Sequence, residues 1–396
     1  MNGKIWTRAL LVAAFTLAAL NLRPAIAGIS PLLIEIRADL GLNAAAGGAI
    51  TTVMVLCLGV VSPLAPVLAR RFGLDRTLLF ALLVLAAGVA LRGADGVWCL
   101  YAGAVVVGTA IAVMNVIMPG VVKQHFPERV GLFTGVYVSA LVAGAAAGSA
   151  LMVPLAEAYG WRLATASAAV LALAAAALWW PQVRPGGATG VGAARGRYRR
   201  LLGRRMTWYV TGYMGVQSMA FYIMLAWLPT IFRDAGLSAV DAGNLLGLTN
   251  FCQIAVTLLV PAYAARSRTQ APHAVISSLL TIAGFTAIMI APTTVPWLWM
   301  IVLAMGQGSA ISLALLIITL RAPDPASVTA LSAVAQSIGY VFAAAGPVLI
   351  GLLHGLTEDW TLPLAVAVGL SVVQLVVGAL AGRPAAESVR RVSVSS

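Results

Sequence analysis

Charged residues are scarce in this chain of 396 residues. Asp, Glu, Lys and Arg make up only 9% of it, whereas hydrophobic residues make up 61%. Soluble domains carry about 25% charged residues, so this composition excludes a soluble globular protein. Apolar segments of about 20 residues cross a bilayer as helices. We therefore predict an all-α integral membrane protein whose first partner is the lipid bilayer.

Cysteines and catalytic motifs are also lacking. The three cysteines, Cys57, Cys99 and Cys252, are scattered over apolar segments, which fits neither a disulfide framework nor a metal cluster. The sequence contains no Walker loop, no His-Glu-x-x-His and no Cys-x-x-Cys. We expect no enzyme, no catalytic residues, no metal site and no cofactor.

Acidic residues are few, and all twelve lie at segment ends or in loops. A proton relay through an embedded carboxylate is therefore not visible in the sequence. Facilitated diffusion, exchange and entry of a proton with the substrate all stay open, with the proton as one candidate coupling ion.

Long apolar segments are abundant. We predict twelve spans, at residues 8–31, 45–69, 77–93, 97–122, 130–153, 163–181, 206–232, 241–264, 273–291, 296–320, 328–352 and 360–382. The first is not a secretory signal, because it exceeds the 7 to 15 residues of a signal core and Arg23 interrupts it.

The basic residues are distributed unevenly over the predicted loops. With the N-terminus in the cytoplasm, 20 of the 25 Lys and Arg residues fall inside, while Arg37, Arg92, Arg162 and Arg233 fall outside. This asymmetry predicts a multi-pass protein with both termini cytoplasmic, in the inner (plasma) membrane of a bacterium. The net charge of +13 is then a topology signal, and we expect no nucleic-acid partner.

An internal repeat divides the chain. Residues near the end of span four recur 198 positions later at the end of span ten: Gly108, Lys123 and Pro127 correspond to Gly306, Arg321 and Pro325. A stretch rich in Gly, Arg and Pro separates the halves. We predict an N-terminal six-helix bundle (1–181), a basic cytoplasmic linker (182–205), a C-terminal six-helix bundle (206–382) and a cytoplasmic tail (383–396), with the two bundles in parallel topology.

Four groups of motifs carry a family resemblance. They are Asn21-Leu22-Arg23-Pro24-Ala25 through Pro31; Asn115-Val116 with Pro119; Gly215-Val216-Gln217-Ser218 with Trp227-Leu228-Pro229; and residues 331–340 with Gly346-Pro347. This set resembles the cyanate and 2-nitroimidazole transporter branch of the major facilitator superfamily. The resemblance implies two pseudo-symmetric six-helix bundles, alternating access and a small-molecule substrate. We expect a monomer.

The loop after span two departs from the wider superfamily, whose motif there is approximately Gly-x-x-x-Asp-Arg-x-Gly-Arg-Arg. Arg70 occupies the usual acidic position, while Arg71 and Gly73 keep their places. A gating salt bridge carried over from the superfamily is therefore in doubt.

Arg23 is the only charged residue that falls well inside a predicted span. A cation at that depth faces a bundle interior or cavity, and a guanidinium fork suits a carboxylate or a similar anion better than lysine does. On a continuous helix Thr16, Ala27 and Ser30 would share its stripe. The alternative is that Arg23 reaches to the outer membrane surface.

Other polar residues in the spans are candidate ligands. The predicted substrate-binding set comprises Arg23, Asn115, Tyr137, Gln217, Tyr222, Gln307, Gln336 and Tyr340, and the candidate cavity-lining residues are Ser30, Trp227 and Asn250. Each one alone is equally compatible with a hydrogen bond between helices. Glycines such as Gly135, Gly144 and Gly148 permit close helix approach.

These patterns predict a secondary active or facilitated transporter that moves a small anion, cyanate-like or organic, by alternating access around Arg23. An exporter of nitroimidazole-like or other small drugs is the alternative, and a transporter-like ligand sensor is a third. The sequence leaves the substrate and the direction of transport open.

Overall fold

The computed structural model describes residues 2–42, 44–183 and 201–384, and within them it contains helices and no strand. Eleven stretches of this described part are long and apolar enough to span a membrane. The described residues thus confirm the all-α prediction.

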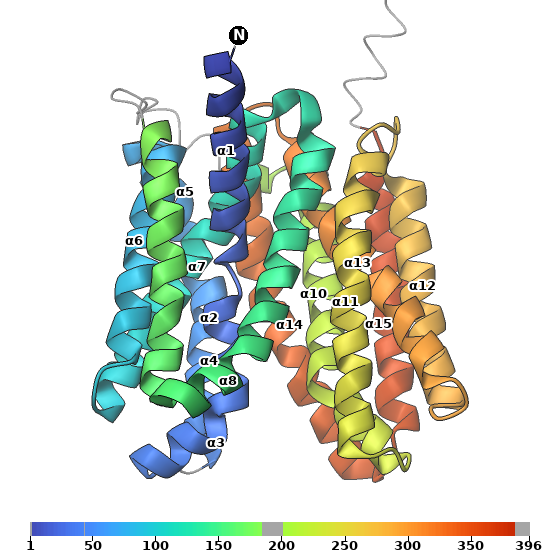
Figure 1. The fold of residues 1–396 in the computed structure, drawn as a ribbon. Helices are drawn as coiled ribbons and strands as arrows, with labels where there is room; N and C mark the ends of the chain where they lie inside the picture. Colours follow the sequence, from blue (N-terminus) through green and yellow to red (C-terminus); the bar gives the residue numbers. More distant parts are fainter. Residues whose placement is uncertain (1, 43, 184–200, 385–396) are drawn as a thin grey trace, which may run out of the picture. The chain divides into compact units, whose positions relative to one another are not determined.

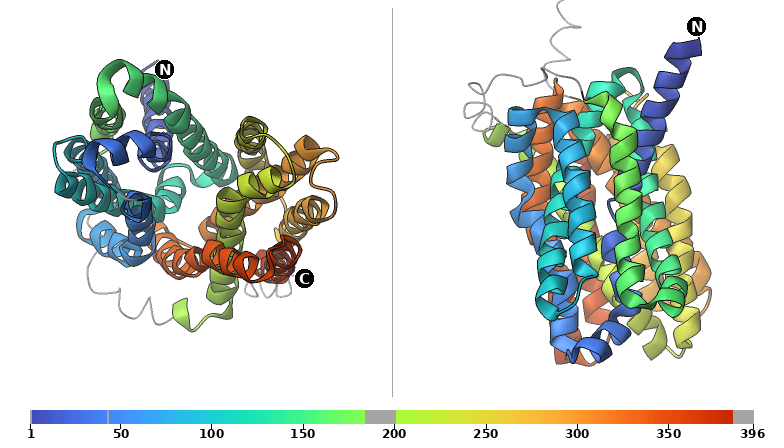
Figure 2. Two further views of the ribbon diagram at one scale, coloured as in Figure 1. Left: turned by 90° about the horizontal axis from the view of Figure 1, so that it is seen from below. Right: turned by 60° about the vertical axis from the view of Figure 1, so that its left-hand side comes forward.

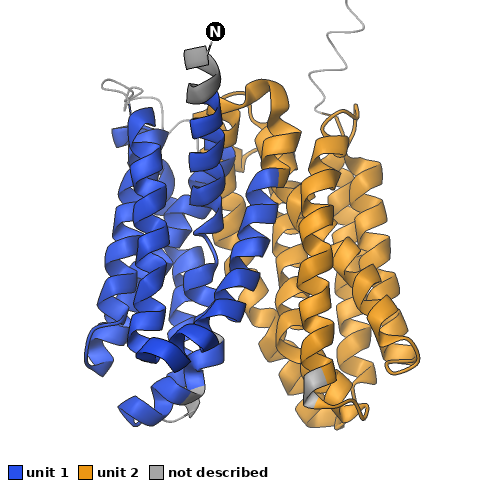
Figure 3. Cartoon of the chain, in the orientation of Figure 1, with its two compact units in different colours: residues 1–121, 136–194 blue, residues 122–135, 195–396 orange. Residues whose placement is uncertain are grey.

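The chain divides into two compact units, shown in Figure 3. Unit 1 comprises residues 1–121 and 136–194, and unit 2 comprises residues 122–135 and 195–396. Most of the predicted linker (182–205) and tail (383–396) lies outside the described residues. The limits of the predicted bundles, linker and tail stay predictions.

The helices of the first half (Figure 1) lie in unit 1, except for η2, the last residues of α7 and the first residues of α8, which belong to unit 2. They are α1 (Asn2–Leu20), α2 (Pro24–Ala27), α3 (Ile29–Leu40), α4 (Ala44–Val60), η1 (Ser62–Leu64), α5 (Ala65–Phe72), α6 (Leu74–Arg92), α7 (Val97–His125), η2 (Pro127–Arg129), α8 (Val130–Trp179) and η3 (Trp180–Gln182). The predicted spans 8–31 and 45–69 are each interrupted, by a turn and by the short helix η1. Hydropathy averaged over a window does not reveal such interruptions, because apolar residues flank each break on both sides.

Helix α8 accounts for the difference between eleven stretches and twelve predicted spans. A straight helix of its 50 residues would be about 75 Å long, more than twice the thickness of the hydrocarbon core. Gly160 has φ 79° and ψ 155°, which is non-helical, and the chain reverses there (Figure 1). The two legs correspond to the predicted spans 130–153 and 163–181.

Unit 2 contains the six spans of the second half, close to their predicted limits. They are α10 (Arg205–Asp234), α11 (Ala239–Ala264), α12 (Ala271–Ile290), α13 (Pro296–Arg321), α14 (Pro325–Thr357) and α15 (Thr361–Gly382). Helices α10 and α14 run side by side (Figure 2). Gly215 and Gly339 face each other there, since a Cβ built on Gly215 would lie 3.3 Å from the Cα of Gly339. The absence of side chains lets these backbones approach.

The two units repeat the same contact between a tryptophan and an aspartate. In unit 1 the indole N–H of Trp161 donates to Asp39 over 3.2 Å, and in unit 2 that of Trp360 donates to Asp234 over 2.9 Å. Each contact ties the end of a half's first span to the start of its sixth. The internal repeat read from the sequence therefore extends to tertiary contacts.

Candidate functional site

The first helix is broken at the position of Arg23. Helix α1 ends at Leu20 and α2 begins at Pro24, whose ring disfavours a helical residue before it. Arg23 accordingly has φ −127° and ψ −29°. The Asn21 amide donates to the carbonyl of Leu17 over 2.8 Å and to that of Leu171, in the second leg of α8, over 3.3 Å. The break is therefore fastened to α8.

The predicted stripe assumed one continuous helix, and residues 21–23 interrupt the helical spacing between Thr16 and Arg23. Thr16 instead donates to the carbonyl of Val12 over 2.8 Å. Arg23 is half-buried, and the side chain of Ser30 lies outside the described part of the chain.

Glycines of α8 press against the backbone of this break. A Cβ built on Gly148 would lie 2.7 Å from the Cα of Pro24, and one on Gly144 would overlap the carbonyl oxygen of Leu20. The close approach predicted for these two glycines is confirmed, and it occurs where the candidate ligand Arg23 is positioned.

Arg92 is a fully buried cation, which sequence reasoning missed. Its side chain is 1% exposed, and Nη1 donates to the carbonyl of Ala25, in α2, over 2.6 Å. A Cβ on Gly103 of α7 would lie 2.6 Å from the backbone nitrogen of Arg92 and 2.8 Å from its Cβ, so this glycine lets α7 approach the backbone of Arg92. The sequence placed Arg92 among the outer cations because it ends a span, and nothing in its immediate neighbours indicates burial.

The buried charge of unit 1 is positive. Among residues whose side chains the structure describes, none of the Asp and Glu residues is buried. The acids lie at exposed ends, where Arg162 pairs with Asp39 at 2.7 Å and with Asp95 at 2.9 Å. Among the described residues of this unit, the charged groups at or near the interior are therefore the buried Arg92 and the half-buried Arg23.

Two predicted ligands of unit 1 come together. The hydroxyl of Tyr137, on α8, donates to Oδ1 of Asn115, on α7, over 3.4 Å, and both side chains are buried. This contact joins two helices, so it supports the packing interpretation as well as the binding one.

The buried polar residues of unit 2 are uncharged hydroxyls and amides, and the amides differ in how they are satisfied. Gln336 donates to the hydroxyl of Ser332 over 2.8 Å. Gln217 donates to that of Ser218 over 2.7 Å, while its Oε1 has no hydrogen-bond partner among the described residues. Gln307, on α13, is 1% exposed, and neither of its amide atoms has a hydrogen-bond partner among the described residues.

Gln253, on α11, was not singled out from the sequence. It is buried, and its Nε2 also has no partner in the described part of the chain. A Cβ on Gly308 of α13 would lie 3.2 Å from the Cγ of Gln253. Gln253 therefore packs against Gly308, the residue that follows Gln307. Its signal, a lone glutamine in an apolar span, is the same as that of Gln307. Unsatisfied buried amides cost about 1–3 kcal/mol each, which makes this pair a candidate for ligand contact.

The remaining predicted residues of unit 2 lie around α10, α11 and α14. The Trp227 indole donates to the carbonyl of Pro347 over 2.9 Å and packs 5.6 Å from the ring of Trp360, which gives it a role in packing. Tyr340 is buried, whereas Tyr222 and Asn250 are half-buried. The Tyr222 hydroxyl has no partner among the described residues.

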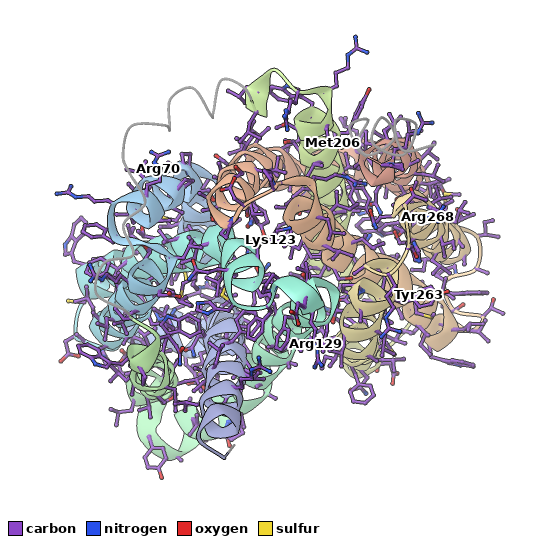
Figure 4. All side chains as sticks on the ribbon, turned by 90° about the horizontal axis from the view of Figure 1, so that it is seen from above. Arg70, Lys123, Arg129, Met206, Tyr263 and Arg268 are labelled. Carbon is purple, nitrogen blue, oxygen red and sulfur yellow. The ribbon has the colours of Figure 1, made fainter. Side chains whose placement is uncertain are left out.

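The loop motif forms the turn between α5 and α6. Gly73 has φ 83°, a conformation that favours glycine, and this explains why it keeps its place in the motif. Arg70 and Arg71 end α5, and Figure 4 looks onto the end of unit 1 that carries Arg70.

The described helices define a multi-pass membrane protein that buries polar groups within its spans and leaves the acids unburied. The family model of the Major Facilitator Superfamily matches residues 10–347, and the chain belongs to that family.

Relatives agree with this assignment. The chain is 36% identical to the 2-nitroimidazole transporter of Escherichia coli (strain K12) over 385 residues, which cover 97% of each protein. It is 28% identical to the cyanate transport protein CynX of the same strain, over 92% of this chain and 96% of the relative. The predicted resemblance to this branch is confirmed.

The fold also matches that of solved transporters. The structure of the major facilitator transporter FucP in the outward conformation superposes with a TM-score of 0.77 at 14% identity, covering 94% of this chain and 99% of that one. This match shows the fold. The family and the relatives make the chain a multi-pass transporter of small solutes in a lipid bilayer, as predicted.

Proposed function

We propose that this transporter moves a small anion by alternating access, as a secondary active or facilitated carrier, and that Arg23 binds the anion. The observation that carries the proposal is the position of Arg23 at the break of the first helix, in a unit whose buried charge is positive. A broken helix places a side chain on irregular backbone, which is tolerated at membrane depth where it lines a cavity or is buried in protein.

The guanidinium group fits this role chemically. Its planar fork donates two parallel hydrogen bonds to a carboxylate or a similarly shaped anion, and such charge-assisted bonds contribute about 1.5–3 kcal/mol. Loss of the fork should therefore weaken anion binding at least about tenfold. Asn115 and Tyr137 supply neutral hydrogen-bonding groups in the same unit.

The test is thermal stabilisation of the purified protein by cyanate, benzoate and 2-nitroimidazole. A ligand that binds the native state raises the melting temperature. We expect an anion to stabilise the wild type but neither Arg23→Ala nor Arg23→Lys. Arg268→Ala, which removes an exposed cation, should respond like the wild type. Equal stabilisation of Arg23→Ala by the anions would overturn the role of Arg23.

A specific observation favours a second candidate, transport of a neutral nitroimidazole-like compound. Gln253 and Gln307 offer buried donors and acceptors without charge, which suit a neutral heteroaromatic solute. Stabilisation by 2-nitroimidazole alone, unchanged in Arg23→Ala but lost in Gln307→Leu, would establish this candidate in place of the anion.

We further propose a monomer in a bacterial inner membrane, with both termini cytoplasmic and with protons as the candidate coupling ion. The basic residues of the inner loops support the orientation. Attachment of a fluorescent reporter to the C-terminus tests it, because green fluorescent protein placed there fluoresces only when that end is cytoplasmic.

A further inference from the structure

A groove lies on the surface of unit 1 between α5 and α6. It has a cavity volume of about 320 Å³ and is lined by Leu68 and Phe72 from α5 and by Arg76, Phe80 and Leu83 from α6. Neither the proposed anion site nor the amide pair of unit 2 uses any of these residues.

The walls of the groove are apolar and open to the outside of the unit. Phe80 is 62% exposed, Phe72 43% and Leu83 42%. Arg76, Phe80 and Leu83 follow one another at helical spacing, so they form a single outward stripe on α6. In a membrane-spanning segment such a stripe faces lipid chains.

One end of the groove is basic. Around the turn at Gly73, Arg70, Arg71 and Arg76 stand against a single acid, Asp75. The guanidinium carbon of Arg71 lies 5.4 Å from the ring centroid of Phe72, which places this cation over a wall of the groove. Arg70 occupies the position that is acidic in the superfamily motif, so the turn of this chain carries more positive charge than the motif does.

The groove is long enough to hold part of a lipid acyl chain. From Arg76 to Leu83 the helix rises about 10 Å, so the groove runs from the basic turn into the apolar span. A phosphate at the turn would contact arginines, and an acyl chain along Phe80 would contact apolar side chains.

We propose that the groove between α5 and α6 binds an anionic phospholipid, with its phosphate at Arg76 and Arg71 and an acyl chain against Phe72, Phe80 and Leu83. Charge decides the occupant, because three arginines against one aspartate favour an anionic headgroup over a zwitterionic one. The position of the groove on a membrane-spanning hairpin favours lipid over a soluble partner.

The experiment is native mass spectrometry of the detergent-purified protein with phosphatidylglycerol or phosphatidylcholine of identical chains. We expect phosphatidylglycerol to bind more tightly. Arg76→Gln should weaken its binding about fivefold, the factor to which roughly 1 kcal/mol per basic residue corresponds. Arg76→Lys should retain binding, and Leu83→Trp, which fills the groove, should reduce it for both lipids.

Arg268→Gln is the matched control, since it removes an exposed arginine that the sequence also assigns to the cytoplasmic side. It should leave lipid binding unchanged. Equal binding of the two lipids, or an equal loss in Arg268→Gln and Arg76→Gln, would show unspecific lipid contact and overturn the proposal. A dimer that Leu83→Trp dissociates would show that a second copy covers the groove, with the same consequence. None of these results depends on the identity of the transported solute.

Discussion

At the scale of single residues, hydrogen bonding distinguishes the buried amides of unit 2 that serve packing from those available to a ligand. Gln336 has a hydroxyl partner one helical turn away, whereas Gln307 is equally buried and has no partner among the described residues. An unmade hydrogen bond costs more than the bond contributes when made. The protein therefore retains Gln307 at a cost to its stability, as expected for a group that meets a ligand.

We predict that Gln307→Leu leaves the melting temperature of the ligand-free protein unchanged or raises it, because an unsatisfied amide worth about 1–3 kcal/mol is removed. Transport or ligand stabilisation should fall in the same variant. Thermal unfolding in detergent and uptake into vesicles measure the two effects.

Gln336→Leu is the comparison, since it leaves the Ser332 hydroxyl without its present partner and should lower the melting temperature. A Gln307→Leu protein that is both less stable and fully active would show that Gln307 serves packing alone.

The sequence predicts site residues well where a polar side chain interrupts an apolar run, as Arg23 and Gln307 do. Gln253 carries the same signal and was nevertheless passed over. Arg92 has no such signal, because its burial depends on Gly103 of another helix and on the carbonyl of Ala25 that the broken first helix exposes. Those are tertiary facts, and hydropathy along one helix does not contain them.

At the scale of helices, the approach of α8 to the break of the first helix positions Arg23. Gly148 and Gly144 leave α8 without side chains where it meets Pro24 and Leu20. A larger residue there must displace the backbone that carries Arg23.

We predict that Gly148→Ala destabilises the protein, although replacing glycine by alanine inside a helix ordinarily stabilises it by about 1 kcal/mol. The added methyl would lie 2.7 Å from the Cα of Pro24 and 2.9 Å from its carbonyl oxygen, both of them backbone atoms. Anion stabilisation should weaken as well, because Arg23 is displaced. Thermal unfolding with and without ligand measures both.

Gly243→Ala in α11 is the matched control. A Cβ there meets nothing within 4 Å, so this variant should be at least as stable as the wild type. If both variants gain stability alike, the contact between α8 and Pro24 is looser than the structure indicates.

Helix limits were predictable from hydropathy wherever a span is one regular helix, as in all six spans of unit 2. The first two spans are long apolar runs that are nevertheless interrupted, before Pro24 in one and at Ser62-Pro63 in the other. Proline marked both places in the sequence, but many membrane helices accommodate proline by a kink alone. Only the surrounding packing decides between a kink and a break.

At the scale of the whole molecule, each unit contains the same hydrogen bond between a tryptophan and an aspartate. The Trp161–Asp39 and Trp360–Asp234 contacts join first and sixth spans and share no partner. An internal offset in sequence predicted two related halves, and these contacts show the relation in atomic detail. The identity of the substrate does not follow from the repeat, because both halves preserve packing residues while their buried polar groups differ.

We predict that Trp161→Phe and Trp360→Phe each lower stability, by roughly 1 kcal/mol for the lost hydrogen bond. The double variant should show the sum of the two effects, since mutations at distant sites without shared partners are additive. Denaturant titration of the four proteins measures this. A double variant that loses clearly more than the sum would show that the two contacts are energetically coupled.

The reversal of α8 at Gly160 has a consequence for biogenesis. The two legs are joined by one non-helical residue, and each leg alone is long enough to cross the bilayer. Because only Gly160 joins the two legs, there is no loop that would let the first leg insert into the bilayer while the second stays outside. The two legs should therefore enter the bilayer together, as a hairpin.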